Sequence, residues 1–392
     1  MIQQGASTQS VHGLHGIDPQ TRAIESPIVL NTAYGYEDLN TWLEVALDRQ
    51  PGHIYSRNSN PTCQSFEEAM ALFEGAEEAT SFSTGMAAIN NTLMALLSPG
   101  QRVVSIKDSY GATFLHFTQL LPRFGVRCDV VETEDVVAFE KAIGQGFDLV
   151  YLESPTNPTL KVIDLERICK AAARAGAVTV VDNTFATPIN QNPLKLGADL
   201  VIHSATKFIC GHNDALGGVV CGRRELVAKI YRYRELTGST LDPFSAYLML
   251  RSIKTLALRV RQQNANALQV AQYLQQHPAV NQVYYPGLPT HPNHDVAAKQ
   301  MRGFGGVLSF DLKGGMEAIE QALPRLRYAY MAANLGQTAT IVGPPAVTSH
   351  VECTAEERAA AGIPEGLVRY AVGIEDAEDL IADLEQAFNP LG

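Results

Sequence analysis

A lysine, an aspartate and two hydroxyls stand where they can hold and activate a ligand. Lys207 follows Ser204 and Thr206 and lies between apolar residues. Burial there would lower the pKa of the amine into the range that is useful for imine chemistry. Asp182 directly follows the apolar run 178–181, and a carboxylate at the end of a buried strand is costly unless it has a partner. By itself, Asp182 fits a structural role, as a helix cap or a salt-bridge partner, as well as it fits a functional one.

A turn of small residues adds an element that can bind an anion. Residues 83–88 (Ser-Thr-Gly-Met-Ala-Ala) follow a short apolar run and open a helical stretch. The backbone N–H groups of Gly85 and Met86 would lie at the positive end of the helix dipole, which suits a phosphate. Alone, such a turn is more often an ordinary N-cap. Together with an acid that can protonate a pyridine nitrogen and a lysine that can form an imine, it supplies the parts that pyridoxal phosphate requires.

The elements that must position these residues alternate between strand and helix. Helical stretches such as 85–97 and 165–175 separate short apolar runs, which predict strands. The predicted strands are 79–82, 102–106, 148–152, 177–181, 200–202 and 218–221. This alternation is the pattern of an α/β fold with a mostly parallel sheet. In such sheets ligands bind beyond the carboxyl ends of the strands, where the polar residues named above fall.

Three regions of the chain differ in texture. Residues 1–60 are rich in turn formers and predict an irregular arm that contacts a neighbouring subunit. Residues 61–250 carry the alternating strands and helices and form the predicted cofactor-binding domain. A long helical stretch, 245 to about 276, then leads into strands such as 306–312. We therefore expect a smaller α+β C-terminal domain over 251–392.

Composition excludes several classes of function. Asp and Glu number 41 against 30 Lys and Arg, which gives a net charge of −11 at pH 7. A protein that binds the phosphate backbone of nucleic acid is expected to carry the opposite sign. The chain opens without a basic and then apolar leader, and no segment approaches the length of about 18 apolar residues that a membrane span needs. We expect a cytoplasmic protein with no nucleic-acid or membrane partner.

Neither the cysteines nor the histidines predict a metal site. The six cysteines, Cys353 included, form no C-x-x-C pair, which fits reduced thiols in a reducing compartment. The pair His12 and His15 lies in a Gly-rich segment, and Pro292 interrupts the pair His291 and His294. Neither pair is a preformed helical site, so we expect no metal.

Longer motifs make the chain resemble one family of enzymes. They are 55–62 (Tyr-Ser-Arg-Asn-Ser-Asn-Pro-Thr), 153–158 (Glu-Ser-Pro-Thr-Asn-Pro), 181–185 (Val-Asp-Asn-Thr-Phe) and 203–207 (His-Ser-Ala-Thr-Lys). These motifs resemble those of the Cys/Met-metabolism pyridoxal-phosphate enzymes. The family includes cystathionine γ-synthase, cystathionine γ-lyase, methionine γ-lyase and the O-acylhomoserine sulfhydrylases. The similarity extends over nearly the whole chain, as far as 365–369 (Glu-Gly-Leu-Val-Arg).

The resemblance implies a fold, an assembly and a set of roles. The fold would be the α/β, aspartate-aminotransferase-like type I fold with a mixed seven-stranded sheet, and the assembly a homotetramer of two catalytic dimers. Lys207 would form the imine with pyridoxal 5'-phosphate and move protons, and Asp182 would pair with the pyridine nitrogen. Tyr110 would stack on the ring and act as partner acid or base, and Asn157 would lie near the phenolic oxygen.

The resemblance also assigns the phosphate and the substrate to particular residues. The phosphate would be held by Gly85, Met86, Ser204 and Thr206 of one subunit and by Tyr55 and Arg57 of its neighbour. Arg369 would bind the substrate carboxylate, a bidentate task that suits a guanidinium. The other residues expected to contact the substrate are Asn334, Tyr110 and Asn157.

Three positions depart from the family pattern and bear on the reaction. Ala112 replaces a cysteine usual in enzymes that cleave methionine, which disfavours a methionine γ-lyase. Asn334 replaces a serine that normally orients the lysine and the carboxylate, and Ala339 replaces a glutamate often linked to γ-chemistry. Loss of that charge weakens the case for cystathionine as substrate. Arg234 and Glu235 fit equally well at the entrance of the site or on a solvated helix face.

The leading hypothesis is γ-elimination on a γ-substituted L-amino acid. The substrate would be a sulfur amino acid, an O-acylhomoserine or another amino acid with a leaving group at Cγ, such as canavanine. The alternative is γ-replacement, as in an O-acylhomoserine sulfhydrylase or a cystathionine γ-synthase. Less favoured are a cystathionine β-lyase and a regulator that binds the cofactor without turnover.

Overall fold

The first layer of the fold is a mixed sheet of seven strands. The computed structural model describes residues 5–13, 22–351 and 354–389, so His15 and Cys353 lie outside the described residues. The strands are β1 (Glu78–Phe82), β2 (Arg102–Ile106), β3 (Arg127–Val131), β4 (Leu149–Glu153), β5 (Val178–Asp182), β6 (Leu200–Ser204) and β7 (Gly218–Gly222). Their order is β1-β7-β6-β5-β4-β2-β3, parallel from β6 to β3, with β7 antiparallel to both neighbours. The predicted mixed seven-stranded sheet is confirmed.

Six of these strands begin and end within two residues of their predicted positions. The seventh, β3, is absent from the prediction because Arg127 and Asp129 interrupt its apolar pattern. It forms one edge of the sheet, and its side chains are not fully buried. An edge strand tolerates such polar residues, whereas a central strand buried on both faces does not.

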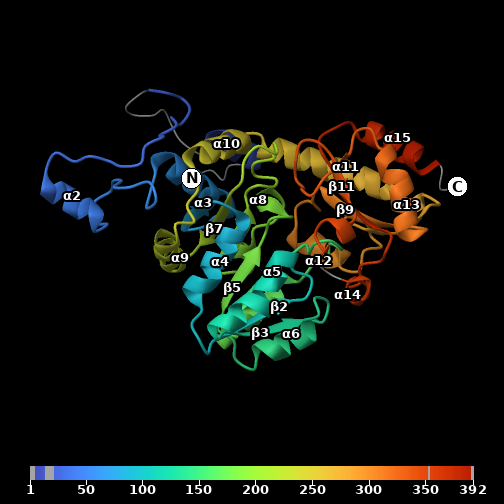
Figure 1. The fold of residues 1–392 in the computed structure, drawn as a ribbon, viewed down its shortest axis with the longest axis horizontal. Helices are drawn as coiled ribbons and strands as arrows, with labels where there is room; N and C mark the ends of the chain where they lie inside the picture. Colours follow the sequence, from blue (N-terminus) through green and yellow to red (C-terminus); the bar gives the residue numbers. More distant parts are fainter. Residues whose placement is uncertain (1–4, 14–21, 352–353, 390–392) are drawn as a thin grey trace.

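Helices cover both faces of this sheet (Figure 1). They are α3 (Pro61–Glu74), α4 (Gly85–Leu96), α5 (Gly111–Leu115), α6 (Val136–Ile143), α7 (Leu165–Ala175), α8 (Thr187–Asn190), α9 (Arg224–Thr237) and α10 (Pro243–Ile253). Neighbouring residues of β5 pack in different layers: Val180 joins the core under α4, and Val181 joins the core under α6 and α7. This alternation lets the C-terminal end of each strand carry polar side chains into a site while the strand itself stays anchored.

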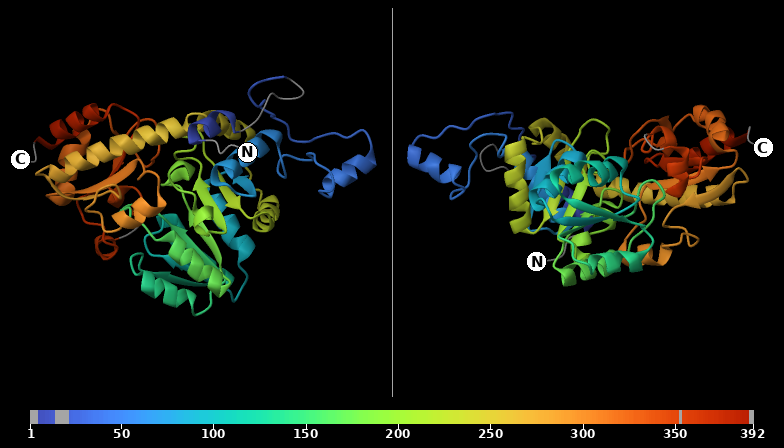
Figure 2. Two further views of the ribbon diagram at one scale, coloured as in Figure 1. Left: turned by 180° about the vertical axis from the view of Figure 1, so that it is seen from behind. Right: turned by 60° about the horizontal axis from the view of Figure 1, so that its bottom comes forward.

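A second sheet of five strands lies beyond the long helix α11 (Leu256–Gln276), which runs along both parts of the molecule (Figure 2). Its strands, in order across the sheet, are β10 (Tyr330–Met331), β11 (Ile341–Gly343), β12 (Leu367–Ala371), β9 (Val307–Leu312) and β8 (Val280–Tyr284). The surrounding helices are α12 (His294–Gln300), α13 (Gly315–Ala322), α14 (Ala355–Ala360) and α15 (Ala377–Phe388). The boundary between residues 250 and 251 stays a prediction.

The helical stretch predicted over 245–276 is two helices rather than one. α10 ends at Ile253 and α11 begins at Leu256, because Thr255 leaves helical geometry with φ −109° and ψ 4°. The break turns the chain from the first sheet toward the second. Periodicity alone does not reveal it, since the apolar pattern continues across the break.

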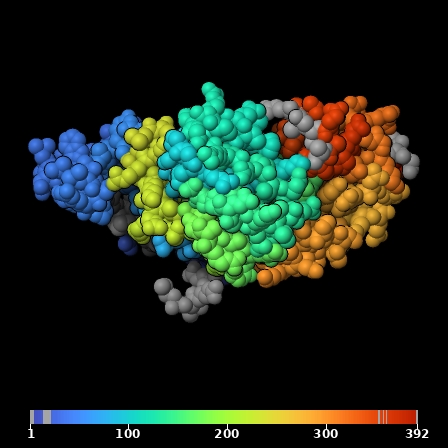
Figure 3. Space-filling model, turned by 90° about the horizontal axis from the view of Figure 1, so that it is seen from below, coloured from blue at the N-terminus to red at the C-terminus, as the bar shows by residue number. Residues whose placement is uncertain are grey.

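An arm near the N-terminus projects from the body of the molecule (Figures 1 and 3). α1 (Ala6–His12) packs on α11, whereas α2 (Leu39–Ala46) lies far out on the arm. In α2, Leu39, Trp42 and Leu43 are each at least 45% exposed. Apolar side chains gathered on a projecting segment are typical of a surface that another chain covers. The contact with a neighbouring subunit stays a prediction.

Neither membrane-spanning helices nor clusters of metal-binding side chains are found among the described residues. Across residues 5–13, 22–351 and 354–389, no helix combines the length and the apolar character that crossing a bilayer requires. The same residues contain no group of three or more His, Cys, Asp or Glu side chains that could hold a metal ion.

Trp42 is the single tryptophan of the chain, so its fluorescence reports on the arm alone. If a second subunit covers α2, the emission of the native protein at micromolar concentration should be that of a buried indole. It should shift to longer wavelength as the protein is diluted and dissociates. Emission typical of a solvated indole at every concentration would contradict the predicted contact. The variant Leu43→Ser should shift the dissociation to higher protein concentration.

Candidate active site

A cavity of about 260 Å³ lies at the carboxyl ends of β4, β5 and β6. Residues 333, 335, 348 and 349, which are close in sequence to strands of the second sheet, line its other side. On the side of the first sheet the lining mixes polar and apolar residues, and from the second sheet it includes Arg369 of β12. The lining residues are Thr84, Gly85, Met86, Ile89, Tyr110, Glu153, Asn157, Asp182, Thr184, Phe185, Ser204, Thr206, Lys207, Leu216, Ala333, Leu335, Thr348, Ser349 and Arg369. All of the predicted site residues except Asn334, Tyr55 and Arg57 are among them.

Lys207 lies in the turn after β6, with its amine held inside the cavity. The Nζ of Lys207 donates to the Oδ1 of Asn334 at 2.6 Å. Burial, followed by the nearby charge of Arg369, lowers the pKa of Lys207 to about 8. The Thr206 hydroxyl exchanges hydrogen bonds with the backbone of Gly217 and so fixes the turn. The amine therefore exists partly in its neutral, nucleophilic form near neutral pH.

Arg369 is a buried cation with polar but uncharged partners. Its Nη1 donates to the Oδ1 of Asn157 at 3.1 Å, and its Nη2 donates to the backbone oxygen of Asn334 at 3.1 Å. Burial lowers its pKa to about 10. Among the described residues no carboxylate forms an ion pair with it. A guanidinium in this condition favours an anionic ligand, and a carboxylate matches its geometry.

Two carboxyl groups meet at the floor of the cavity. Glu153 and Asp182 end the neighbouring strands β4 and β5 and are paired in register. Burial is the largest cause that raises the pKa of each, and the Asp182 charge raises that of Glu153 further. The backbone N–H of Thr184 donates to Asp182 Oδ1 at 3.0 Å, and that of Tyr110 donates to Glu153 Oε2 at 2.8 Å. Asp182 is thus a buried acid that a cationic ligand atom would stabilise.

The first turn of α4 forms a cradle for an anion. Thr84 caps the helix by accepting from the N–H of Ala87 at 3.0 Å. The N–H groups of Gly85 and Met86 have no partner within the helix, because they belong to its first turn. A Cβ on Gly85 would lie 2.7 Å from the Cβ of Ser204 and would fill the cradle. The residues present therefore fit the phosphate, the pyridine nitrogen and the aldehyde carbon of pyridoxal phosphate.

Asn334 is not among the lining residues, yet it connects two that are. Its side chain accepts from Lys207, and its backbone oxygen accepts from Arg369. Its Nδ2 donates to the Oδ1 of Asn213 at 2.7 Å. Asn334 therefore does hold the lysine, although a serine was expected at this position from the family pattern.

Tyr55 and Arg57 lie outside the cavity of their own chain. The Arg57 guanidinium lies over the Tyr55 ring, with 5.1 Å between its Cζ and the ring centroid. The Tyr55 side chain is 40% exposed. Their expected role in a neighbouring subunit's phosphate site stays a prediction.

Sequence reasoning missed five polar residues of the lining. They are Thr84, Glu153, Thr184, Thr348 and Ser349. The position of Glu153 at the end of a buried strand, like that of Asp182, is the signal that could have revealed it. Arg234 neither lines this cavity nor lies on a solvated helix face, because its side chain is buried and bonds to Glu67, Ser81 and Asn58. Neither Ala112 nor Ala339 lines the cavity.

This fold and this cavity together define a pyridoxal-phosphate-dependent enzyme of fold type I. The family model described as "Cys/Met metabolism PLP-dependent enzyme" matches residues 7–389. The chain belongs to that family, and its cofactor is pyridoxal phosphate.

Several characterised proteins are similar to the chain. It is 39% identical to L-methionine gamma-lyase of Porphyromonas gingivalis over 394 residues, covering 100% of this chain and 98% of that one. It is 42% identical to O-succinylhomoserine sulfhydrylase of Pseudomonas aeruginosa, covering 87% and 85%. It is 41% identical to the chloroplastic cystathionine gamma-synthase 1 of Arabidopsis thaliana, covering 95% of this chain and 66% of that longer one. The similar proteins thus span elimination and replacement.

A solved structure is also similar. The cystathionine gamma synthase of Xanthomonas oryzae, in complex with aminoacrylate and cysteine, superposes with a TM-score of 0.94 at 39% identity. The superposition covers 99% of this chain and 98% of that one.

Asn334→Ala should weaken catalysis because Lys207 loses its hydrogen-bond acceptor. We expect kcat/KM to fall about tenfold, the equivalent of about 1.4 kcal/mol for one charge-assisted hydrogen bond. Asn334→Ser should retain more activity than Asn334→Ala, because a hydroxyl can accept from the amine. Equal rates for wild type and Asn334→Ala would show that this hydrogen bond does not matter in the working enzyme.

Glu153→Gln should stabilise the chain in the absence of cofactor. Folding raises the pKa of Glu153 above its ordinary value of 4.5. The folded state therefore binds this proton more tightly, and the carboxyl group destabilises it increasingly as pH rises above that value. The melting temperature of Glu153→Gln should exceed that of wild type by a margin that grows from pH 4.5 to pH 7, where the difference in the free energy of unfolding reaches roughly 1 kcal/mol. The same substitution at the exposed Glu320 should show no such trend, and a margin independent of pH would contradict the assignment.

Proposed function

We propose that this enzyme eliminates a substituent from Cγ of an L-amino acid. The observation that carries the proposal is the juxtaposition, in one cavity, of a neutralisable amine at Lys207 and a buried guanidinium at Arg369 that lacks a carboxylate partner among the described residues. Arg369 would bind the α-carboxylate of the substrate, while Asn157 and Asn334 hold the guanidinium in place. A substrate bound in this way would have its Cα within reach of the lysine side of the cavity.

When bound, pyridoxal phosphate supplies an electron sink for negative charge that develops on the substrate. The phosphate would be held by the first turn of α4 with Ser204 and Thr206, and Asp182 would pair with the pyridine nitrogen. Lys207, with its pKa of about 8, can accept the Cα proton at Nζ and hold it near Asn334. The Tyr110 hydroxyl would hold or move a proton for the leaving group. Thr348 and Ser349 would contact the outer part of the substrate.

The charge of the lining bears on the leaving group. Apart from Glu153 and Asp182 at the floor, the lining residues include no carboxylate. A substrate whose distal end carries an ammonium group, such as cystathionine, would therefore lack an acidic partner from this part of the chain. A neutral substituent joined to Cγ through sulfur or oxygen fits this lining better.

γ-Replacement is the second candidate. It differs only in whether a nucleophile reaches the substrate after the leaving group departs. In its favour, the similar structure is a cystathionine gamma synthase with cysteine bound, and a similar sequence is an O-succinylhomoserine sulfhydrylase. We also propose a cytoplasmic homotetramer in which Tyr55 and Arg57 of one subunit complete the phosphate site of the next.

One assay decides between the two reactions. The purified enzyme is incubated with O-acetylhomoserine, O-succinylhomoserine, cystathionine, methionine, homocysteine and canavanine, each with and without an added thiol. Release of 2-oxobutanoate and ammonia without thiol is expected, whereas release of homoserine would mean that water has replaced the substituent. Turnover that requires thiol would instead establish replacement. Lys207→Ala serves as the control and should lose both turnover and the visible absorbance of the bound cofactor.

A further inference from the structure

Glu74 is a fully buried carboxyl group that the proposed reaction does not use. It is the last residue of α3, and Gly75 ends the helix in the left-handed conformation with φ +70°. Its exposed fraction is 0%. A negative charge is disfavoured at the C-terminal end of a helix, and burial adds a desolvation cost. An acid in this position therefore calls for partners of comparable strength.

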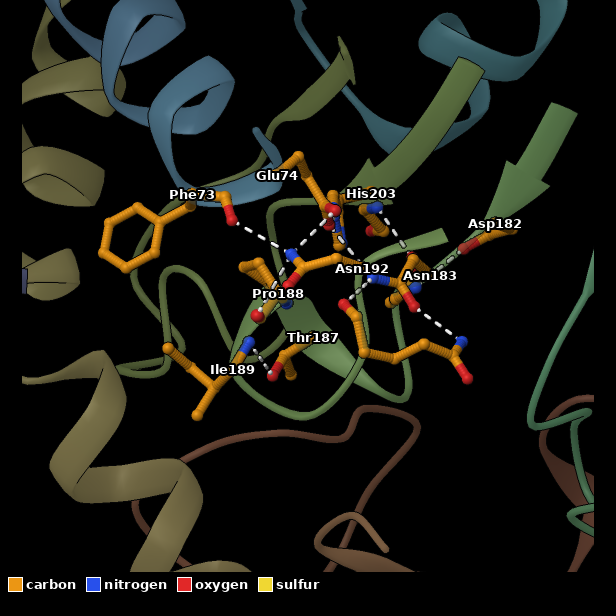
Figure 4. Close-up of polar contacts among 12 residues, drawn as sticks. Phe73, Glu74, Asp182, Asn183, Thr187, Pro188, Ile189, Asn192 and His203 are labelled. Carbon is orange, nitrogen blue, oxygen red and sulfur yellow. Dashed lines mark hydrogen bonds and ion pairs between the residues drawn. The ribbon is translucent and has the colours of Figure 1, made fainter. Parts of the chain in front are cut away.

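Three buried side chains surround the Glu74 carboxyl group (Figure 4). His203 Nε2 lies 2.6 Å from Oε1, and Asn183 Nδ2 donates to the same oxygen at 2.9 Å. Asn192 Nδ2 donates to Oε2 at 3.2 Å. Both carboxyl oxygens are thus engaged, and the charged group that backs the cluster is Arg302, which donates to Asn192 Oδ1 at 2.9 Å.

Two of these partners are direct neighbours of cavity residues. Asn183 follows Asp182 at the end of β5, and His203 precedes Ser204 at the end of β6. Asp182 and Ser204 line the cavity, whereas Asn183 and His203 do not. Successive side chains of a strand point to opposite faces. Glu74 therefore contacts the ends of the adjacent strands β5 and β6 from the face away from the cavity.

Backbone and side-chain hydrogen bonds connect Asn183 and His203 to the residues on the cavity side. The N–H of Asn183 donates to the Ile202 oxygen at 2.9 Å, which extends the pairing of β5 and β6 beyond Asp182. The N–H of Ser204 donates to Thr184 Oγ1 at 2.9 Å. A displacement of Asn183 or His203 would therefore move Asp182, Thr184 and Ser204 together.

We propose that Glu74 is a positioning residue that sets the place of Asp182 beneath the cofactor ring by holding Asn183 and His203. The proposal rests on the role of Asp182 toward the pyridine nitrogen given under the proposed function. The electrostatics support it: burial raises the pKa of Asp182, while the hydrogen bonds from Thr184 and the His203 charge lower it. A cluster that fixes His203 thus helps Asp182 to keep its charge.

The test compares Glu74→Gln with Glu68→Gln, an exposed carboxylate on the same helix. For each protein, the dissociation constant of pyridoxal phosphate and the pH midpoint of the bound cofactor's absorbance are measured, with Asp182→Asn as the reference. Glu74→Gln should raise the dissociation constant about tenfold, as expected when a buried donor loses its partner. It should also move the pH midpoint in the same direction as Asp182→Asn, while Glu68→Gln leaves both quantities unchanged.

The outcomes separate a positioning role from a merely structural one. A lower melting temperature for Glu74→Gln with unchanged dissociation constant and midpoint would overturn the proposal. If Glu74→Gln does not fold, Asn183→Ala takes its place, since alanine removes a hydrogen bond that Glu74 accepts, and an unchanged midpoint there would also overturn it. If Asp182→Asn itself leaves the absorbance unchanged, the assignment of Asp182 fails instead. A shift in Asp182→Asn without one in Glu74→Gln rejects only the role of Glu74.

Discussion

Desolvation of charge is the constraint on which this site depends. Burial is the largest cause of the pKa shifts of Lys207, Asp182 and Arg369, lowering the first to about 8 and the third to about 10 and raising that of Asp182. Charged groups withdrawn from water bind ligands of the opposite charge strongly, because the ligand restores the lost solvation. Under the proposed roles, the carboxylate of an amino acid would be the partner of Arg369 and the ring nitrogen of the cofactor that of Asp182, while the neutral amine of Lys207 would react with the aldehyde.

The fold places these groups together by two simple means. Parallel strands end at one edge of a sheet, so Glu153, Asp182 and the turn leading to Lys207 meet there although they are far apart in the chain. The second sheet then contributes Arg369 from β12, which closes the cavity over that edge. The site therefore lies between the two parts of the molecule, and α11 runs along both (Figure 2).

Much of this architecture could be predicted from the sequence because it is local. Continuous apolar runs mark the central strands, and the polar residues that follow them mark the cavity. β3 could not be predicted, because an edge strand does not need such a run. The break between α10 and α11 could not be predicted either, because the apolar periodicity continues across it. Glu74 could not be assigned a partner, since His203 lies 129 residues away and only the fold brings the two together. The same holds for Asn334, which is 127 residues from Lys207.

The most direct test of the account is to identify the lysine that carries the cofactor. The holoenzyme is reduced with borohydride, digested and analysed by mass spectrometry. We expect a pyridoxyl phosphate adduct on the peptide that contains Lys207, and on no other lysine. An adduct on a different lysine, or none in a protein that binds the cofactor, would contradict it.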